Sequence, residues 1–185
     1  GIKWFLESCW KAVKSASPNV KAYFAGRNMP DWLLENDMKD VNIVGEVDDS
    51  VRFMTSKQIM VVPLLSGSGI RIKIIEAMSI GKPVIATTIA AEGLMYENGK
   101  NIIIADTPEE FALAVKHCLE NPEFCNEIGY QASQLIATKY DINNRSERTR
   151  GIWLRHRVVS QPYSGDELER PVGDLYVEIS AQFFA

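Results

Sequence analysis

The sequence predicts an α/β domain of three layers, in which helices cover both faces of a parallel sheet. Two observations carry this prediction. Short apolar runs without polar alternation, such as residues 59–62 and 84–87, are typical of strands that are buried on both faces. Amphipathic helical segments alternate with these runs through short loops, which is the pattern of parallel strands joined by right-handed helical crossovers.

The predicted elements follow one another in a regular order. Apolar residues at helical spacing indicate a first helix over residues 3–16. Residues 107–110, Thr-Pro-Glu-Glu, form a capping box with proline in the first turn, which predicts that a helix begins there and runs to about residue 120. Asp31 is expected to cap a short helix. The remaining expected elements are strands over 20–25, 41–44, 59–64, 84–87 and 101–105, and helices over 31–36, 48–57, 70–80 and 122–139.

A glycine-rich loop joins the strand over 59–64 to the helix over 70–80. Gly67 and Gly69 interrupt the apolar pattern at this point. Open parallel sheets bind ligands at this edge, beyond the carboxyl ends of the strands. Free backbone N–H groups and the positive end of the helix dipole favour a phosphate there, and glycine lets the backbone approach it closely. Gly67, Ser68 and Gly69 are therefore the predicted phosphate-binding loop.

Charged side chains on the following helix support this hypothesis. A helix that is apolar over most of its surface is usually buried, yet Arg71, Lys73 and Glu76 lie on this one. Arg71 and Lys73 are expected to face a phosphate, and the Glu76 carboxylate can accept hydrogen bonds from both hydroxyls of a ribose. Lys73 and Glu76 are also three residues apart, so an ordinary ion pair on the helix fits the same spacing.

Three stretches of this region together resemble the donor-binding half of the group-1 (family 4) glycosyltransferases, which are retaining enzymes of the GT-B class. The stretches are residues 67–78 (GSGIRIKIIEAM), 81–87 (GKPVIAT) and 91–94 (AEGL). The resemblance covers roughly residues 3–150. It implies a Rossmann-like domain that forms one half of a GT-B fold, and it implies that Glu76 holds the ribose of the donor nucleotide.

The resemblance also implies where the rest of the donor lies. Gly45, Glu46 and Val47 follow the strand over 41–44 and are expected near the nucleobase, although Gly45 fits a plain turn glycine equally well. A second glutamate of the family, eight positions before the ribose-binding one, is Ser68 here. Thr87 either lines the pocket or satisfies local backbone groups. The substrate would be a nucleoside diphosphate-sugar, with no further cofactor.

A GT-B enzyme has two domains that face each other across a cleft, and the resemblance covers one of them. The chain is thus expected to be the donor-binding half of an enzyme that transfers a hexosyl group with retained configuration. It would be inactive without its partner, an N-terminal acceptor-binding domain. No catalytic base is assigned. No metal site is expected, because His117 and His156 lack ligand partners and no D-x-D pair is present.

Two other functions remain open at the level of sequence. A sugar-nucleotide epimerase shares the fold, but it would need a histidine near the anomeric carbon, and this segment shows none. A non-catalytic nucleotide-binding or interaction module is the second alternative. A dinucleotide dehydrogenase is disfavoured, because Gly67-Ser68-Gly69 lacks the third glycine of the usual fingerprint.

Composition excludes several kinds of partner and location for the chain. With a net charge of −4, nucleic acid is not an expected partner. Cys9, Cys118 and Cys125 form no disulfide framework, and no apolar run approaches the length of a membrane span. A cytoplasmic location is expected, with a glycan acceptor or a peripheral position at the inner membrane face as further expectations.

The C-terminal part of the sequence changes character. We divide the chain into a donor-binding domain over 1–158 and a linker with a tail strand over 159–185. Residues 144–157 are rich in arginine, which suits a solvated helix or a contact with the missing domain or an anionic surface. Residues 160–174 contain proline and glycine and indicate a linker. Residues 174–185 alternate apolar and polar side chains, which predicts a strand with one buried face, and its pairing partner is not identified.

Overall fold

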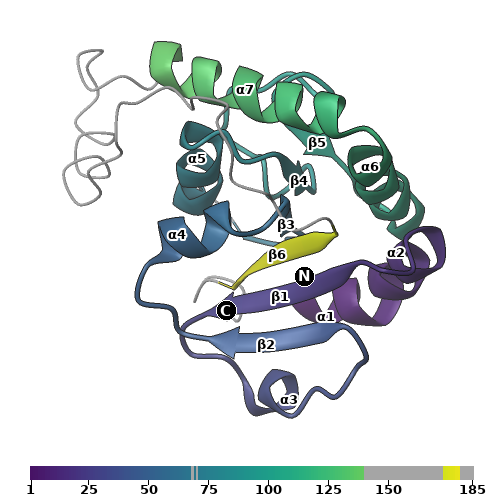
Figure 1. The fold of residues 1–185 in the computed structure, drawn as a ribbon. Helices are drawn as coiled ribbons and strands as arrows, with labels where there is room; N and C mark the ends of the chain where they lie inside the picture. Colours follow the sequence, from purple (N-terminus) through teal and green to yellow (C-terminus); the bar gives the residue numbers. More distant parts are fainter. Residues whose placement is uncertain (68, 70, 140–172, 180–185) are drawn as a thin grey trace.

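Six parallel strands form one sheet in the part of the chain that the computed structural model describes, which comprises residues 1–67, 69, 71–139 and 173–179. Their order across the sheet is β2-β1-β6-β3-β4-β5 (Figure 1). The strands are β1 Lys21–Gly26, β2 Val41–Gly45, β3 Ile59–Val62, β4 Val84–Ala86, β5 Ile103–Ile104 and β6 Asp174–Ile179. The helices are α1 Ile2–Trp4, the π-helical η1 Phe5–Cys9, α2 Trp10–Ala16, α3 Asp31–Leu34, α4 Ser50–Thr55, α5 Ile72–Ser79, α6 Pro108–Glu120 and α7 Pro122–Lys139.

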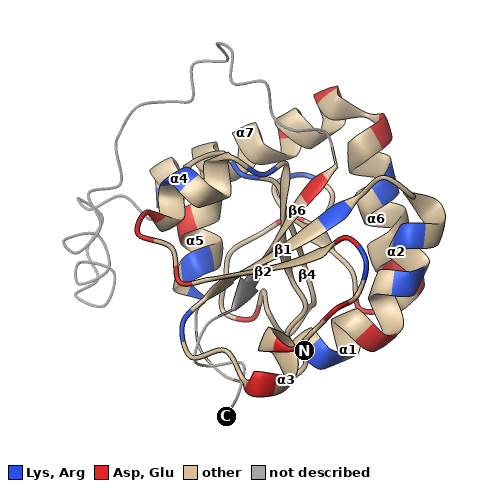
Figure 2. Cartoon of the chain, turned by 60° about the horizontal axis from the view of Figure 1, so that its bottom comes forward, with Lys and Arg blue, Asp and Glu red and all other residues tan. Residues whose placement is uncertain are grey.

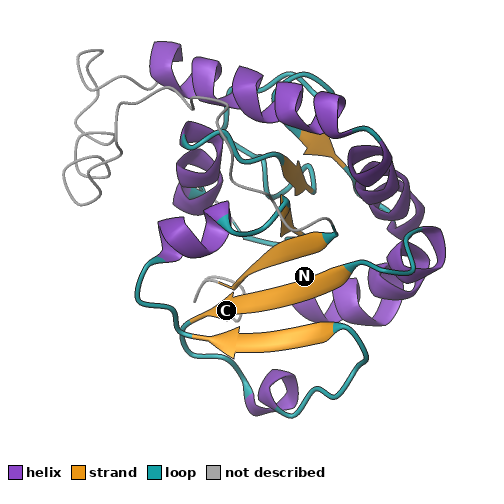
Figure 3. Ribbon diagram, viewed as in Figure 1, coloured by secondary structure: helices purple, strands orange, loops and turns teal. Residues whose placement is uncertain are grey.

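Helices cover both faces of the sheet, as Figure 3 shows. Strand β3 illustrates the division, because successive side chains of a strand point to opposite faces. Ile59 and Val61 join one buried core with α1, η1, α2 and α6. Met60 and Val62 join a second core with α4, α5 and α7. The predicted three-layer α/β fold with a parallel sheet is therefore confirmed.

Local signals in the sequence account for the starts of helices α4 and α6. Thr107 Oγ1 accepts from the backbone N–H of Glu110 at 3.2 Å, while the Glu110 carboxylate accepts from the N–H of Thr107 at 3.0 Å, so the predicted capping box is present. Asp49 caps α4 with its side chain. The expectation for Asp31 was wrong: it is the first residue of α3, Pro30 holds the cap position, and no side-chain cap bond forms.

Strand β6 departs most from what its sequence pattern predicts. Its alternation of apolar and polar residues indicated a strand with one exposed face, whereas Leu175, Tyr176 and Val177 are all buried. The strand lies in the middle of the sheet, parallel to β1 on one side and to β3 on the other. Tyr176 is buried on the face predicted to be polar, because its ring packs edge-on against Phe53 with centroids 5.4 Å apart.

Several predictions fall outside the described residues. The boundary between residues 158 and 159, the arginine-rich segment and most of the expected linker lie within 140–172. Ser68 of the predicted phosphate-binding loop and residues 180–185 of the predicted tail strand also lie outside the described residues, so all of these stay predictions. Acidic and basic residues of the described part are interspersed on the helices and loops (Figure 2). None of the helices in the described part is long and apolar enough to cross a membrane.

Candidate functional site

The predicted site residues gather at one edge of the sheet. All six strands of the described chain are parallel, so their carboxyl ends share that edge. The glycine loop follows the end of β3, Gly45 ends β2, and Thr87 follows the end of β4. The topology thus brings together segments that are up to about forty residues apart in the sequence.

Two glycines give the loop before α5 a backbone shape that other residues rarely adopt. The φ angles of Gly67 and Gly69 are +116° and +91°, and both lie in the region that favours glycine. A Cβ atom added at Gly69 would meet no heavy atom within 4 Å. The backbone at Gly69 therefore faces open space, as a loop that admits a ligand close to its main chain requires.

The Arg71 side chain lies directly against this loop. Arg71 is the residue that precedes α5, and it is only 7% exposed. A Cβ atom added at Gly67 would lie 2.9 Å from Arg71 Nη2. The guanidinium group is consequently held beside the loop at the amino-terminal end of α5, so its positive charge adds to that of the helix dipole.

Lys73 and Glu76 form the ion pair that their spacing predicts. Lys73 Nζ lies 2.7 Å from Glu76 Oε2, at angles outside hydrogen-bond geometry. Lys73 also donates a hydrogen bond to Ser50 Oγ at 3.0 Å, which ties α5 to the first residue of α4. The sequence did not point to Ser50, because nothing in its own segment distinguishes it from an ordinary residue of the first helical turn.

The Glu76 carboxylate is not satisfied by this ion pair alone. Its side chain is 6% exposed, and Oε1 has no hydrogen-bond partner among the described residues. A buried acceptor without a donor destabilises the fold by roughly 1–3 kcal/mol, and by more when it is charged. The described residues therefore leave Oε1 without a donor, and the ion pair and the ligand-binding hypothesis are compatible.

Thr87 is buried and makes its hydrogen bonds within the protein. It is 1% exposed, its hydroxyl donates to the carbonyl oxygen of Leu64, and the same oxygen accepts from the N–H of Ala90 at 3.1 Å. Of the two interpretations of Thr87, these contacts favour the local one. Thr87 therefore joins the chain beyond β3 to the chain beyond β4.

Two polar contacts at the same edge were not foreseen. Thr88 donates from its backbone N–H and from its hydroxyl to Asp106, at 2.7 and 2.6 Å, and so joins the ends of β4 and β5. Arg27 and Glu46 form an exposed ion pair at 2.5 Å beyond β1 and β2. Nothing in the sequence indicates either contact, because each one joins the ends of two different strands that only the assembled sheet brings together.

Gly45 satisfies both interpretations that the sequence allowed. Its φ angle of +80° is that of a turn glycine, and a Cβ atom added there would meet nothing within 4 Å. Val47 is partly buried against the core that contains α4 and α5. The segment 45–47 thus presents an open main chain at the sheet edge, with Glu46 held by its ion pair.

The remaining reactive side chains of the described part lie elsewhere. No group of three or more His, Cys, Asp and Glu residues in this part could hold a metal ion. Cys9, Cys118 and Cys125 are buried, and none of the three forms a disulfide within the described part of the chain. Burial, with a smaller contribution from Glu109, raises the pKa of the Cys9 thiol to about 12.

Comparison with known proteins shows which family and which relatives this chain is similar to. The family model described as Glycosyl transferases group 1 matches residues 1–121. A curated relative from Klebsiella pneumoniae, an uncharacterized 44.6 kDa protein in the cps region, is 26% identical over an alignment of 153 residues, and the match covers 76% of this chain and 39% of the relative.

Solved structures of Anabaena Alr3699/HepE have a similar fold. The complex with UDP matches with a TM-score of 0.64 and 19% identity, over 80% of this chain and 42% of that one. The complex with UDP and glucose matches with a TM-score of 0.62 and 20% identity over the same shares. The chain thus spans about two fifths of the length of these relatives. Because the family model matches well over half of its residues, this chain belongs to the group 1 glycosyltransferases.

Proposed function

We propose that this chain binds the nucleotide-sugar donor of a retaining glycosyltransferase at the carboxyl edge of its sheet. The observation that carries the proposal is Glu76, a buried carboxylate whose Oε1 lacks a donor among the described residues, on the helix that follows an open glycine loop. Membership of the family supports the class of reaction. The proteins of similar fold were solved in complex with UDP, alone or with glucose, which supports a nucleoside diphosphate as the ligand.

Each residue of the site has a separate task in this proposal. The backbone N–H groups of the loop 67–69 and the amino-terminal end of α5 hold the diphosphate. Arg71 and Lys73 stabilise the negative charge that grows on the departing diphosphate as the bond to the sugar breaks. Glu76 accepts hydrogen bonds from the ribose hydroxyls. Ser50 keeps the Lys73 ammonium in place, so it acts as a positioning residue.

The nucleobase is proposed to lie against the open main chain of Gly45, Glu46 and Val47. No nucleophile or base is assigned to this chain, and hexosyl transfer with retained configuration follows from the family resemblance. The acceptor, a glycan, would bind to a separate N-terminal domain, and the chain would be inactive without it. We also propose that the whole enzyme is cytoplasmic and works at the inner face of the membrane.

The epimerase alternative has less support than donor binding. It needs a histidine at the reacting carbon, and His117 is the one histidine in the described part of the chain. Its ring packs at a tilt of 58° against Phe124 with centroids 4.4 Å apart, and its Nδ1 lies 3.1 Å from the side-chain nitrogen of Asn121. His117 is thus engaged at the junction of α6 and α7.

A thermal-shift screen with UDP, GDP and ADP tests the proposal. A ligand present at 100 times its Kd adds about 2.7 kcal/mol to the free energy of unfolding. One of the three diphosphates should raise the Tm, and its nucleoside should do so far less at the same concentration. If all three diphosphates left the Tm unchanged up to millimolar concentration, the donor-binding proposal would fail and a non-catalytic module would be favoured.

A further inference from the structure

The corner between helices α6 and α7 is a tight one. Helix α6 ends at Glu120 and α7 begins at Pro122, so the single residue Asn121 separates them. Asn121 donates its N–H to the carbonyl oxygen of His117 at 3.0 Å, and its own carbonyl oxygen accepts from the N–H of Cys125 at 3.1 Å. These two hydrogen bonds tie the last turn of α6 and the first turn of α7 to the same residue.

The corner brings together residues that are seven positions apart in the sequence. His117 on α6 lies against Phe124 on α7, with ring centroids 4.4 Å apart. The next pair with the same spacing is Cys118 and Cys125. Both side chains belong to one buried core, with exposed fractions of 0% and 2%, and the Cys118 thiol is hydrogen-bonded to Cys125. The two sulfur atoms are thus in contact without a covalent bond between them.

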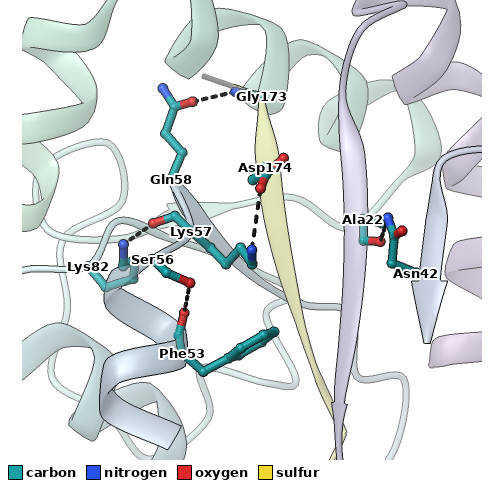
Figure 4. Close-up of polar contacts among 9 residues, drawn as sticks. All are labelled: Ala22, Asn42, Phe53, Ser56, Lys57, Gln58, Lys82, Gly173 and Asp174. Carbon is teal, nitrogen blue, oxygen red and sulfur yellow. Dashed lines mark hydrogen bonds and ion pairs between the residues drawn. The ribbon is translucent and has the colours of Figure 1, made fainter. Parts of the chain in front are cut away.

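The opposite side of α7 is packed as closely as the side that faces α6. A Cβ atom added at Gly129, four residues after Cys125, would collide with the carbonyl oxygen of Gly81 in the turn before β4. In the same turn, Lys82 is buried and donates to the carbonyl oxygen of Lys57, as Figure 4 shows. The start of α7 is therefore held between α6 and a turn that is anchored at the amino edge of the sheet, so the two thiols stay in contact.

The third cysteine of the described chain provides a contrast. Cys9 lies on η1 and shares the same buried core. No group of three or more His, Cys, Asp and Glu residues in the described part could hold a metal ion, so Cys9 does not complete a metal site with the pair. Structural zinc needs four ligands, whereas two thiols in contact are what a disulfide requires.

The two paired thiols differ in their readiness to react. The hydrogen bond to Cys125, burial and the charge of Cys125 all raise the pKa of Cys118, so Cys118 is the thiol that keeps its proton. Cys125 lies in the first turn of the 18-residue helix α7, where the helix dipole favours an anion, and it is the more exposed of the two. The geometry thus makes Cys125 the first thiol to react and Cys118 the second.

We propose that Cys118 and Cys125 are a redox-active pair that a peroxide oxidises to a disulfide. The Cys125 thiolate attacks one oxygen of hydrogen peroxide, the O–O bond breaks, and hydroxide leaves, so that Cys125 becomes a sulfenic acid. The Cys118 sulfur then attacks the Cys125 sulfur, the S–O bond breaks, and the Cys118 proton leaves with the hydroxyl group as water. The two thiols lose two electrons to the peroxide, and two water molecules form in total.

Burial controls the rate of this reaction more than its outcome. Because Cys125 is nearly buried, peroxide reaches it when the first turn of α7 opens locally, and helix ends open at a lower free energy than the middle of a core. The product suits its surroundings, because a disulfide carries no charge and an apolar core disfavours charge. A small thiol reductant reverses the reaction by the same local opening.

Mass spectrometry of the folded full chain tests the proposal. The chain is treated with hydrogen peroxide, unfolded, alkylated with N-ethylmaleimide and cut with trypsin, which should release both cysteines in the single peptide 117–139. After peroxide this peptide should be lighter by two hydrogens and carry no alkyl group, while Cys9 should stay alkylated. Dithiothreitol before alkylation should restore both thiols. A peptide 117–139 that remains doubly alkylated while Cys9 is oxidised would overturn the proposal.

Three serine variants test the order of the two steps. Cys118→Ser should accumulate a sulfenic acid at Cys125, which dimedone traps, because the second thiol is missing. Cys125→Ser should give no dimedone adduct at Cys118, and Cys9→Ser is the matched control that should form the disulfide as the wild type does. Adducts at Cys118 in place of Cys125 would overturn the assigned order, and the wild-type peptide map decides the proposal if a variant does not fold. None of these measurements involves a nucleotide, so their outcome is independent of the proposed donor binding.

Discussion

Replacing Glu76 with glutamine separates a ribose ligand from a purely structural ion pair. The two side chains have the same shape, but the amide presents one acceptor and one donor where the carboxylate presents two acceptors. In the structure one carboxylate oxygen lies 2.7 Å from Lys73 Nζ, and the other has no partner among the described residues. The substitution therefore removes the ion pair and also changes the group offered to a ligand.

The expected loss follows from the strength of charged hydrogen bonds. A hydrogen bond to a charged group contributes roughly 1.5–3 kcal/mol, so Glu76→Gln should weaken binding of the nucleoside diphosphate about 10- to 150-fold. A 2′,3′-dideoxynucleoside diphosphate lacks the hydroxyls that Glu76 would bind. For that ligand the same substitution should change the Kd by less than about threefold, which is the range of indirect effects on non-contacting groups.

Isothermal titration calorimetry of both proteins with both ligands completes a double-mutant cycle. Glu120→Gln is the matched control, since Glu120 pairs with Lys116 at 3.8 Å on the exposed surface of α6, and it should leave both affinities unchanged. Equal losses for the two ligands in Glu76→Gln, with a lower Tm, would refute the ribose contact and leave the ion pair as the whole role of Glu76.

Four further predictions concern the loop, the charges, the isolated chain and acid stability. Gly69→Val should abolish diphosphate binding, because valine does not tolerate a φ of +91° and its side chain would fill the open space before the loop; an unchanged Kd in a folded variant would reject the phosphate loop. Neutralising Arg71 and Lys73 together should weaken the diphosphate strongly and the nucleoside little, as paired titrations would show; equal losses would indicate a folding role. The chain alone should transfer no sugar to any acceptor, so turnover in a radiolabel assay would contradict the two-domain account. The Lys14 ammonium, 2.7 Å away, lowers the pKa of Asp40, so the unfolded chain takes up this proton at higher pH than the folded one. The stability from this pair is present above the ordinary pKa near 4 and is lost as the pH falls through the lowered value, and urea denaturation should show a shallower acid dependence for Asp40→Asn; an identical dependence would mean that the pair contributes nothing.

The sequence predicted the parts of the fold whose signals are local. Residues 59–62 are apolar without alternation, and they form β3, buried on both faces. The capping box at Thr107 begins a helix where expected, and the helix expected over 48–57 is present as α4, with Asp49 as its cap. The glycine loop could be foreseen because Gly67 and Gly69 interrupt an apolar pattern between a strand and a helix, which is itself a sign of a ligand-binding turn.

The features that escaped prediction depend on strand order. The alternation in residues 174–179 indicated one exposed face, but Tyr176 fits beside Phe53, and the position of β6 between β1 and β3 buries both faces of the strand. Nothing in the sequence of β6 itself reveals this central position. In the same way, the Ser50 contact to Lys73 and the Asp106 contact to Thr88 join segments that only the assembled sheet brings together.

The most direct test of the central claim is to map the bound nucleoside diphosphate by NMR. In ¹H–¹⁵N spectra of the chain titrated with the diphosphate that the thermal screen selects, the amides of the loop around Gly67 and Gly69 and of the start of α5 should shift. The amides of Lys57 and Asp174, at the opposite edge of the sheet, should stay in place. Shifts confined to that opposite edge, or none at saturating ligand, would contradict a donor site at the carboxyl ends of the strands.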